Sequence, residues 1–148
     1  MSNPPHILIV ESRFYDEISD PLLQGTIETL EFNNATYDVV TVPGALETPA
    51  AVQFAATNKD NKHYDAYIAL GCVIRGETTH YETVCNESCR GLTDVALKHN
   101  LAIGNGILTV ENKEQAMDRA DKNKKNKGGG AARAALAMYK LKQKYKLA

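Results

Sequence analysis

The densest group of residues that could do chemistry follows an apolar run at residues 66–72, where Gly76, Thr78 and His80 occur close together. A glycine and threonines ahead of a helix leave backbone N–H groups free, and these groups, with the positive end of the helix dipole, bind anions such as phosphate. His80 adds a side chain that titrates near neutrality and can transfer protons during a carbonyl condensation. The same residues also fit an ordinary helix cap beside a solvated histidine, so this segment alone leaves both interpretations open.

Two other loops that follow apolar runs carry residues suited to binding a flat, polar molecule. Residues 43–47 read PGALE, a tight turn that would present backbone amides and the Glu47 carboxylate, which could bind hydroxyl groups. The alternative is a plain strand-to-helix connection in which the helix dipole favours Glu47. Phe14 follows the first apolar run in a polar context. Its ring could stack on a heterocycle or pack beneath its own loop.

A cluster of cations in the last third of the chain is suited to phosphate. Arg119 ends a helical stripe, and a lysine-rich segment follows it up to Lys127. A guanidinium group binds phosphate in a bidentate fork, whereas most lysines in such a run are solvated surface residues. We therefore favour Arg119 and place Lys127 second. The chain has neither a GxGxxG nor a GKS/GKT phosphate loop, which argues against binding of a dinucleotide or ATP.

The cysteines do not predict a disulfide or a metal centre. Cys72, Cys85 and Cys89 form no CxxC pair and make an odd count, which suits reduced thiols in a cytoplasmic protein. Cys85 and Cys89 lie one helical turn apart downstream of His80, but a fourth ligand with metal-site spacing is missing. We expect buried free thiols.

Composition narrows the class of protein further. The chain has 148 residues, of which 43% are hydrophobic and 24% charged, and this predicts one globular domain over residues 1–148. A formal net charge of -1 argues against broad electrostatic binding to nucleic acid or anionic lipid. No apolar stretch approaches the roughly 18 residues of a membrane span, and the N-terminal apolar run is short. We therefore expect a protein that is neither secreted nor membrane-spanning.

The elements that must position these residues alternate between strands and helices. Continuous apolar runs predict strands, covered on both faces, at residues 6–10, 37–42 and 66–72. A fourth run at residues 101–110, broken by Gly104 and Gly106, predicts a further strand. Apolar stripes and caps predict helices at residues 20–32 (with a possible start at 16), 48–57, 81–99, 112–120 and 130–146. We expect a loop or helix kink at residues 121–130. This order predicts an α/β fold with a four-stranded parallel sheet between helices, and a ligand site beyond the carboxyl ends of the strands.

Six blocks, taken in order, resemble the lumazine synthase family over nearly the whole chain. They are residues 12–14, 42–47, 71–80, 106–109, 114–116 with Arg119, and 126–128. The resemblance implies a flavodoxin-like, doubly wound three-layer αβα fold and a transferase of riboflavin biosynthesis. It would condense 5-amino-6-(D-ribitylamino)uracil with 3,4-dihydroxy-2-butanone 4-phosphate to 6,7-dimethyl-8-ribityllumazine.

The resemblance also implies roles for particular residues. Phe14 would stack on the pyrimidine, and His80 would donate a proton. The phosphate would be held by the amides of Glu77 and Thr78 and by Arg119, with Lys127 as a supporting cation. Further contacts to the pyrimidine and ribityl groups would come from Ala45, Leu46, Glu47 and, through their main chain, Cys72, Val73 and Ile74. A neighbouring subunit would contribute Asn105 and Arg119, so the site would lie at an interface in a homo-oligomer, and no metal or organic cofactor would be needed.

The sequence departs from the family pattern at a few positions. Asn105 stands where many members have phenylalanine, and it would bind the pyrimidine by hydrogen bonding. Gly129 and Gly130 stand where an acidic residue is common, and the loop at residues 121–125 is rich in lysine. The lost acidic residue and the lysine-rich loop change the kink before the last helix, and we therefore favour a free pentamer over a shell of sixty subunits.

Competing functions remain open at this point. A non-catalytic flavin- or lumazine-binding protein could use the same stacking Phe14, and a structural shell or storage role could make the site incidental. Arg119, Thr78 and His80 together argue against a pure binding protein. A flavodoxin-like signalling domain would need an exposed phospho-acceptor aspartate after a strand, and none is placed there.

Overall fold

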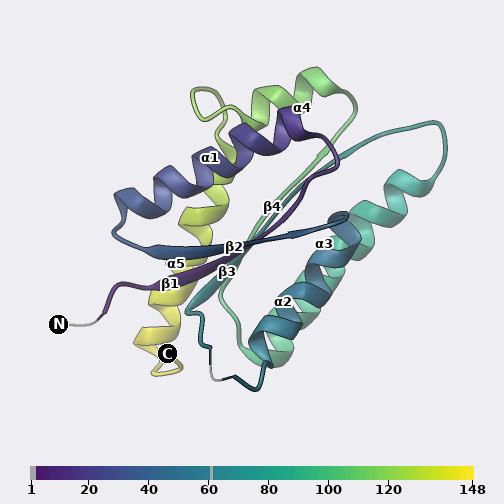
Figure 1. Cartoon of the computed structure of the whole chain (residues 1–148). Coiled ribbons are helices and arrows are strands. Elements are labelled where there is room, and N and C mark those ends of the chain that lie inside the picture. The colour runs from purple at the N-terminus through teal and green to yellow at the C-terminus, as the bar shows by residue number, and fades with distance from the viewer. Residues whose placement is uncertain (1–2, 61) are drawn as a thin grey trace.

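The computed structural model describes residues 3–60 and 62–148, and its parallel sheet lies between two layers of helices (Figure 1). The strands are β1 (His6–Ser12), β2 (Thr36–Val42), β3 (Ala66–Ile74) and β4 (Ile103–Val110), in the spatial order β2-β1-β3-β4. The helices are α1 (Asp16–Phe32), α2 (Thr48–Ala56), α3 (His80–His99), α4 (Lys113–Ala120) and α5 (Lys127–Lys144), with a short 3-10 turn η1 (Ala45–Glu47). The predicted flavodoxin-like α/β fold is confirmed.

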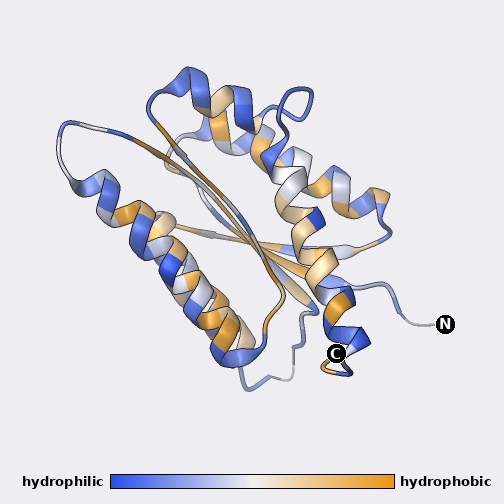
Figure 2. Ribbon diagram, turned by 180° about the vertical axis from the view of Figure 1, so that it is seen from behind, coloured by the Kyte–Doolittle hydropathy of each residue, from blue (hydrophilic) through white to orange (hydrophobic). Residues whose placement is uncertain are grey.

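The sheet is buried on both faces because each face carries its own hydrophobic core. Ile7 and Ile9 of β1 pack with apolar residues of α1 and α5, whereas Leu8 and Val10 pack with α2 and α3. Figure 2 shows hydrophobic residues concentrated in the strands and hydrophilic ones spread over helices and loops. This two-sided burial explains why β1 and β3 read as continuous apolar runs. Among the helices described, none is long and apolar enough to cross a membrane.

The sheet opens at its carboxyl end between β1 and β3. Pairing of β1 with β3 stops at Glu11 and Leu70, whereas β3 stays paired with β4 as far as Ile74. The chain continues from β1 to β2 on one side and from β3 to β4 on the other, so the strand order reverses at this point. A crevice at such a reversal is the expected ligand site of a doubly wound sheet.

Helix α1 begins at Asp16, the earlier of its two predicted starts, and not at the Asp20-Pro21 signal. The carbonyl oxygen of Tyr15 accepts hydrogen bonds from the amides of Ile18 and Ser19, at 3.0 and 2.9 Å. Because Ile18 is buried, the first turn gains hydrophobic contacts as well as hydrogen bonds. Pro21 therefore lies inside the helix, where it has no N–H to donate to the carbonyl oxygen of Glu17.

Helix α5 also begins before its predicted start at Gly130. Asn126 adopts a left-handed conformation, and its side-chain oxygen accepts a hydrogen bond from the Gly129 amide at 3.2 Å. A Cβ atom at Gly128 would overlap the carbonyl oxygen of Leu22, so this glycine allows α5 to pack closely on α1. Taken by themselves, the three glycines at residues 128–130 predict a loop. In the structure they belong to the first turn of α5, where Gly128 contacts α1. The other predicted element ends differ from the structure by a few residues.

Strand β2 lies at one edge of the sheet, and its predicted coverage on both faces is wrong. Val39 and Val40 are 38% and 41% exposed. The cause is topological, because β1 is the only strand that pairs with β2 among the described residues. Strand β2 therefore has the β-branched residues that are typical of a buried strand, although its edge position leaves them partly exposed.

A polar cluster ties β2 to its neighbours at the amino end of the sheet. The Asp38 carboxylate accepts hydrogen bonds from the Tyr64 hydroxyl at 2.8 Å and from His6 Nε2 at 3.3 Å, and Lys62 Nζ lies 3.1 Å away. The Tyr64 hydrogen bond, followed by Lys62, lowers the pKa of Asp38 from 3.8 to about 2. Since the folded pKa is depressed, this stabilisation is present above pH 3.8 and is lost as the pH falls through about 2.

Replacing Asp38 with asparagine should therefore destabilise the fold only where the carboxylate is ionised. We expect Asp38→Asn to lower the Tm at pH 7 by about 2–4 °C. The difference from the parent should narrow between pH 4 and pH 2 in calorimetry. Asp94→Asn is the matched control, because among residues 3–60 and 62–148 Asp94 pairs only with Arg90, on the exposed face of α3. A Tm of Asp38→Asn that equals the parent's at pH 7 would contradict this role.

Candidate active site

A cavity of about 380 Å³ occupies the crevice between β1 and β3. We call it the Phe14 pocket, and it is lined by Ser12, Phe14, Tyr15, Pro43, Gly44, Ala45, Leu46, Glu47, Cys72, Val73, Ile74, His80 and Val84. These residues lie at the carboxyl ends of β1 and β3, in the segments that follow β1 and β2, or in the first turns of α3. The structure thus brings His80 together with every residue that was predicted to contact the pyrimidine or ribityl group from this side.

Phe14 stands exposed at this pocket instead of packing beneath its own loop. Its side chain is 73% exposed, and its ring meets the edge of the Tyr15 ring at a centroid distance of 4.9 Å and an angle of 71°. The packing alternative for Phe14 is therefore wrong. One face of an aromatic ring at the rim of an apolar cavity is suited to stacking on a flat heterocycle.

The PGALE segment forms the second wall of the pocket. Ala45 is buried, whereas Leu46 and Glu47 are exposed at the rim. The Thr48 hydroxyl donates to the Ala45 carbonyl oxygen at 2.7 Å and fixes this turn at the start of α2. Glu47 can therefore offer its carboxylate to ligand hydroxyl groups from a defined backbone.

The main chain of β3 forms the floor. Beyond Leu70, β3 has no β1 partner, so its backbone from Cys72 to Ile74 borders the pocket on that side. Burial raises the pKa of the Cys72 thiol to about 11, which keeps it neutral at pH 7. Cys72 is therefore suited to main-chain contacts and not to nucleophilic attack. Cys85 and Cys89 are free as predicted, although they are half-buried and not fully buried.

The loop from β3 to α3 has the properties of an anion site. His80 is the first residue of α3, and its amide donates to the Thr78 hydroxyl oxygen at 3.3 Å. The amides of Glu77 and Thr78 have no acceptor within the described part of the chain. Arg75, at the start of this loop, donates a hydrogen bond from Nη1 to Glu82 Oε1 in α3 at 2.5 Å. Glu77 and Thr78 lie outside the Phe14 pocket but lead directly into His80.

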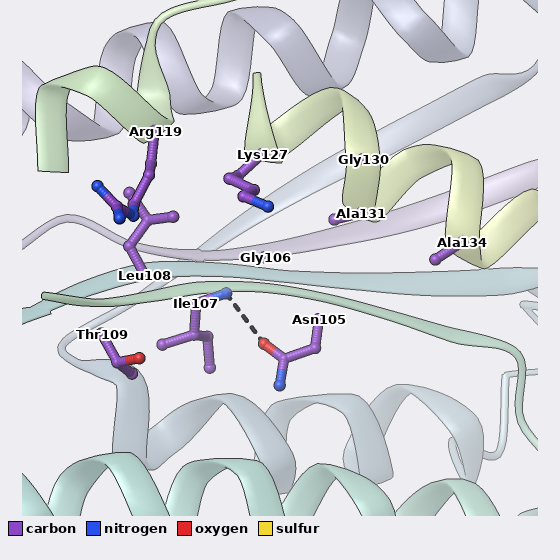
Figure 3. A pocket seen from close by; sticks show the side chains of 10 residues that line it. All are labelled: Asn105, Gly106, Ile107, Leu108, Thr109, Arg119, Lys127, Gly130, Ala131 and Ala134. Atoms are coloured by element: carbon purple, nitrogen blue, oxygen red, sulfur yellow. Dashed lines mark hydrogen bonds between the residues drawn. The ribbon is translucent and has the colours of Figure 1, made fainter. Parts of the chain in front are cut away.

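A second hollow of about 430 Å³ lies along the free edge of β4 (Figure 3). We call it the Arg119 pocket, and it is lined by Asn105, Gly106, Ile107, Leu108, Thr109, Arg119, Lys127, Gly130, Ala131 and Ala134. Arg119 Nη1 donates to the Gln115 carbonyl oxygen at 3.1 Å, and its ion-pair partner Asp118 is as far as 3.9 Å away. Most donors of this guanidinium group are thus available to an anion. Lys127 points into the same hollow.

Comparison with known proteins identifies the family. The sequence matches the profile of 6,7-dimethyl-8-ribityllumazine synthase over residues 4–143. The chain belongs to the 6,7-dimethyl-8-ribityllumazine synthase family. A Bartonella henselae protein of that name is 61% identical over 140 residues, which cover 95% of this chain and 90% of the relative. An Agrobacterium fabrum protein of the same name is 58% identical over 142 residues, covering 95% and 96%.

For a lumazine synthase family member, the separation of the two pockets is informative. They share no lining residue, since the Phe14 pocket opens between β1 and β3 and the Arg119 pocket follows the edge strand β4. The structure therefore does not bring Asn105, Arg119 or Lys127 to His80 within one chain. Their contribution from a neighbouring subunit stays a prediction.

Several residues that line the Phe14 pocket of this lumazine synthase family member were not named individually as substrate contacts, although Pro43 and Gly44 belong to the predicted PGALE turn. They are Ser12, Tyr15, Pro43, Gly44 and Val84. Tyr15 could have been suspected, because it directly follows Phe14. Val84 lies one helical turn after His80, and its place on an apolar stripe suggested only core packing.

Proposed function

We propose that this chain condenses 5-amino-6-(D-ribitylamino)uracil with 3,4-dihydroxy-2-butanone 4-phosphate to 6,7-dimethyl-8-ribityllumazine, a step of riboflavin biosynthesis. The observation that carries the proposal is the meeting of Phe14, Glu47, the β3 backbone and His80 around one cavity in a chain of this family. The whole chain acts as one domain. Its reduced cysteines suit the cytoplasm.

The Phe14 pocket holds the pyrimidine. Phe14 stacks on the ring, the main chain of residues 72–74 hydrogen-bonds its polar edge, and Ala45, Leu46 and Glu47 hold the ribityl chain. Burial of most of a flat ligand against apolar walls, with a few polar contacts for orientation, is typical of small-molecule sites. The neutral Cys72 thiol leaves the amino group of the substrate as the nucleophile.

The phosphate lies where a second copy of the chain completes the site. Glu77 and Thr78 amides bind it from one subunit, while Arg119 and Lys127 bind it from the next, together with Asn105 at the pyrimidine. Two different surfaces that meet head to tail generate a closed ring when the rotation allows it. We infer a pentamer, in line with the altered residues before and within the start of α5.

The reaction asks mainly for placement of two substrates. The 5-amino group attacks the ketone, water leaves as the imine forms, phosphate is eliminated, and the ribitylamino nitrogen closes the ring with loss of a second water. Holding both reactants in register can supply about 7–11 kcal/mol of the barrier. His80 transfers protons at the carbonyl, which typically contributes about 100- to 10,000-fold.

The test is to mix the purified protein with both substrates and record lumazine absorbance and released phosphate. The proposal predicts one phosphate for each lumazine formed. A non-catalytic lumazine- or flavin-binding protein would bind the heterocycle and release no phosphate, and that result would reject the proposed function.

A further inference from the structure

The ring of Phe14 has little that holds it directly. It is 73% exposed, and the aromatic ring it meets is that of its neighbour Tyr15. The position of the ring over the pocket therefore depends on the backbone of residues 12–15. Any group that fixes this turn also fixes the stacking surface.

Arg13 ties this turn to three carboxylates. Its Nε donates to both oxygens of Glu11 at 3.0 Å, its Nη1 to Asp16 at 2.9 Å and its Nη2 to Asp20 at 2.5 Å. Glu11 is only 4% exposed and also accepts a hydrogen bond from the Thr41 hydroxyl at 2.9 Å. Such a planar fork with several simultaneous partners is a geometry that guanidinium provides and ammonium does not.

The hydrogen bonds around Arg13 connect the strands before and beside Phe14 to the helix that follows it. Glu11 belongs to the end of β1, Thr41 to β2, and Asp16 and Asp20 to the first turns of α1. Arg13 thus joins the segment before Phe14 to the helix after it. The charges are not used by the proposed chemistry, and Arg13 does not line the Phe14 pocket.

We propose that Arg13 is a positioning residue, which holds the turn at residues 12–15 through Glu11, Asp16 and Asp20 and so presents the Phe14 ring to the heterocycle. This inference rests on the proposed function, because the heterocycle is taken to be the pyrimidine or the lumazine. Ordering the turn before binding lowers the entropy that the ligand would otherwise have to overcome. Arg13 therefore sets affinity for the ring and leaves the phosphate site unaffected.

The test is Arg13→Lys, which keeps the charge but cannot serve three carboxylates at once. Equilibrium dialysis with 6,7-dimethyl-8-ribityllumazine measures ring binding without turnover. We expect the Kd for lumazine and the KM for the uracil to rise about tenfold, with the KM for the keto-phosphate changed by less than about twofold. Arg90→Lys is the matched control, since Arg90 bridges Glu87 and Asp94 on the surface of α3, away from both pockets, and should leave all three constants unchanged.

A second variant covers the case in which Arg13→Lys fails to fold. Asp20→Asn removes one exposed arm of the network and should weaken lumazine binding about threefold, again without an effect on the keto-phosphate. Parental lumazine binding in the folded Arg13→Lys protein, or equal losses for both substrates, would overturn the positioning role alone. A parent protein that neither binds nor forms lumazine would overturn the proposed function as well.

Discussion

Replacing Arg119 with alanine is expected to raise the KM for the keto-phosphate by about 100-fold and the KM for the uracil by less than about threefold. A charge-assisted hydrogen bond to phosphate contributes about 1.5–3 kcal/mol, and each 1.4 kcal/mol corresponds to about tenfold. The guanidinium group is free for this task, because its single hydrogen bond to the described residues is to the Gln115 carbonyl oxygen and Asp118 lies 3.9 Å away. Steady-state kinetics with each substrate varied in turn measure the two constants.

Two further variants sharpen the Arg119 experiment. Arg119→Lys keeps a charge but loses the bidentate fork, so it should fall between the parent and the alanine variant. Arg133→Ala removes an exposed guanidinium of α5 that does not line the Arg119 pocket, and it should leave both KM values unchanged. Equal increases in the two KM values for Arg119→Ala would contradict a phosphate role.

Replacing His80 with alanine is expected to lower kcat by about 100-fold without abolishing turnover. The residue lines the Phe14 pocket at the start of α3, from where it can exchange a proton with the oxygen of a carbonyl group held next to the pyrimidine. Placement of the two reactants supplies more of the rate than one proton-transfer group does, and that placement survives in the variant. Single-turnover measurements at saturating substrate isolate the chemical step.

His63→Ala serves as the matched control for His80. The His63 side chain is 82% exposed and lies 3.7 Å from Asp65, which leads into β3 at the end of the sheet opposite the pocket. The His63→Ala variant should retain the parental kcat. If His80→Ala assembled like the parent and gave no detectable lumazine, positioning could not be the dominant contribution.

The fold could be predicted wherever the residues of one segment alone show whether that segment is buried. Strands β1 and β3 are covered on both faces, so their apolar runs identify them directly. The start of α5 was not predictable, because Gly128 is required by the Leu22 carbonyl oxygen of α1, a residue distant in sequence. The exposure of Val39 and Val40 likewise follows from sheet order and not from their own types.

The candidate site divides in the same way. Residues that follow strands, such as Phe14 and Glu47, could be placed from the rule that ligands bind at the carboxyl ends of a parallel sheet. The network around Arg13 could not, because its partners Glu11 and Asp20 are ordinary charged residues until the turn brings them together. Arg119 was identified by type, but only the structure places it in a separate pocket.

Co-assembly of two defective variants tests most directly whether neighbouring subunits complete the site. His80→Ala and Arg119→Ala are co-expressed with different tags, purified as mixed particles, and assayed at a keto-phosphate concentration below the parental KM. If one subunit supplies His80 and the next Arg119, about a quarter of the sites in a random ring carry both intact residues, and activity returns to about a quarter of the parent's. Activity no higher than the average of the two separate variants, in particles shown to be mixed, would contradict a shared site.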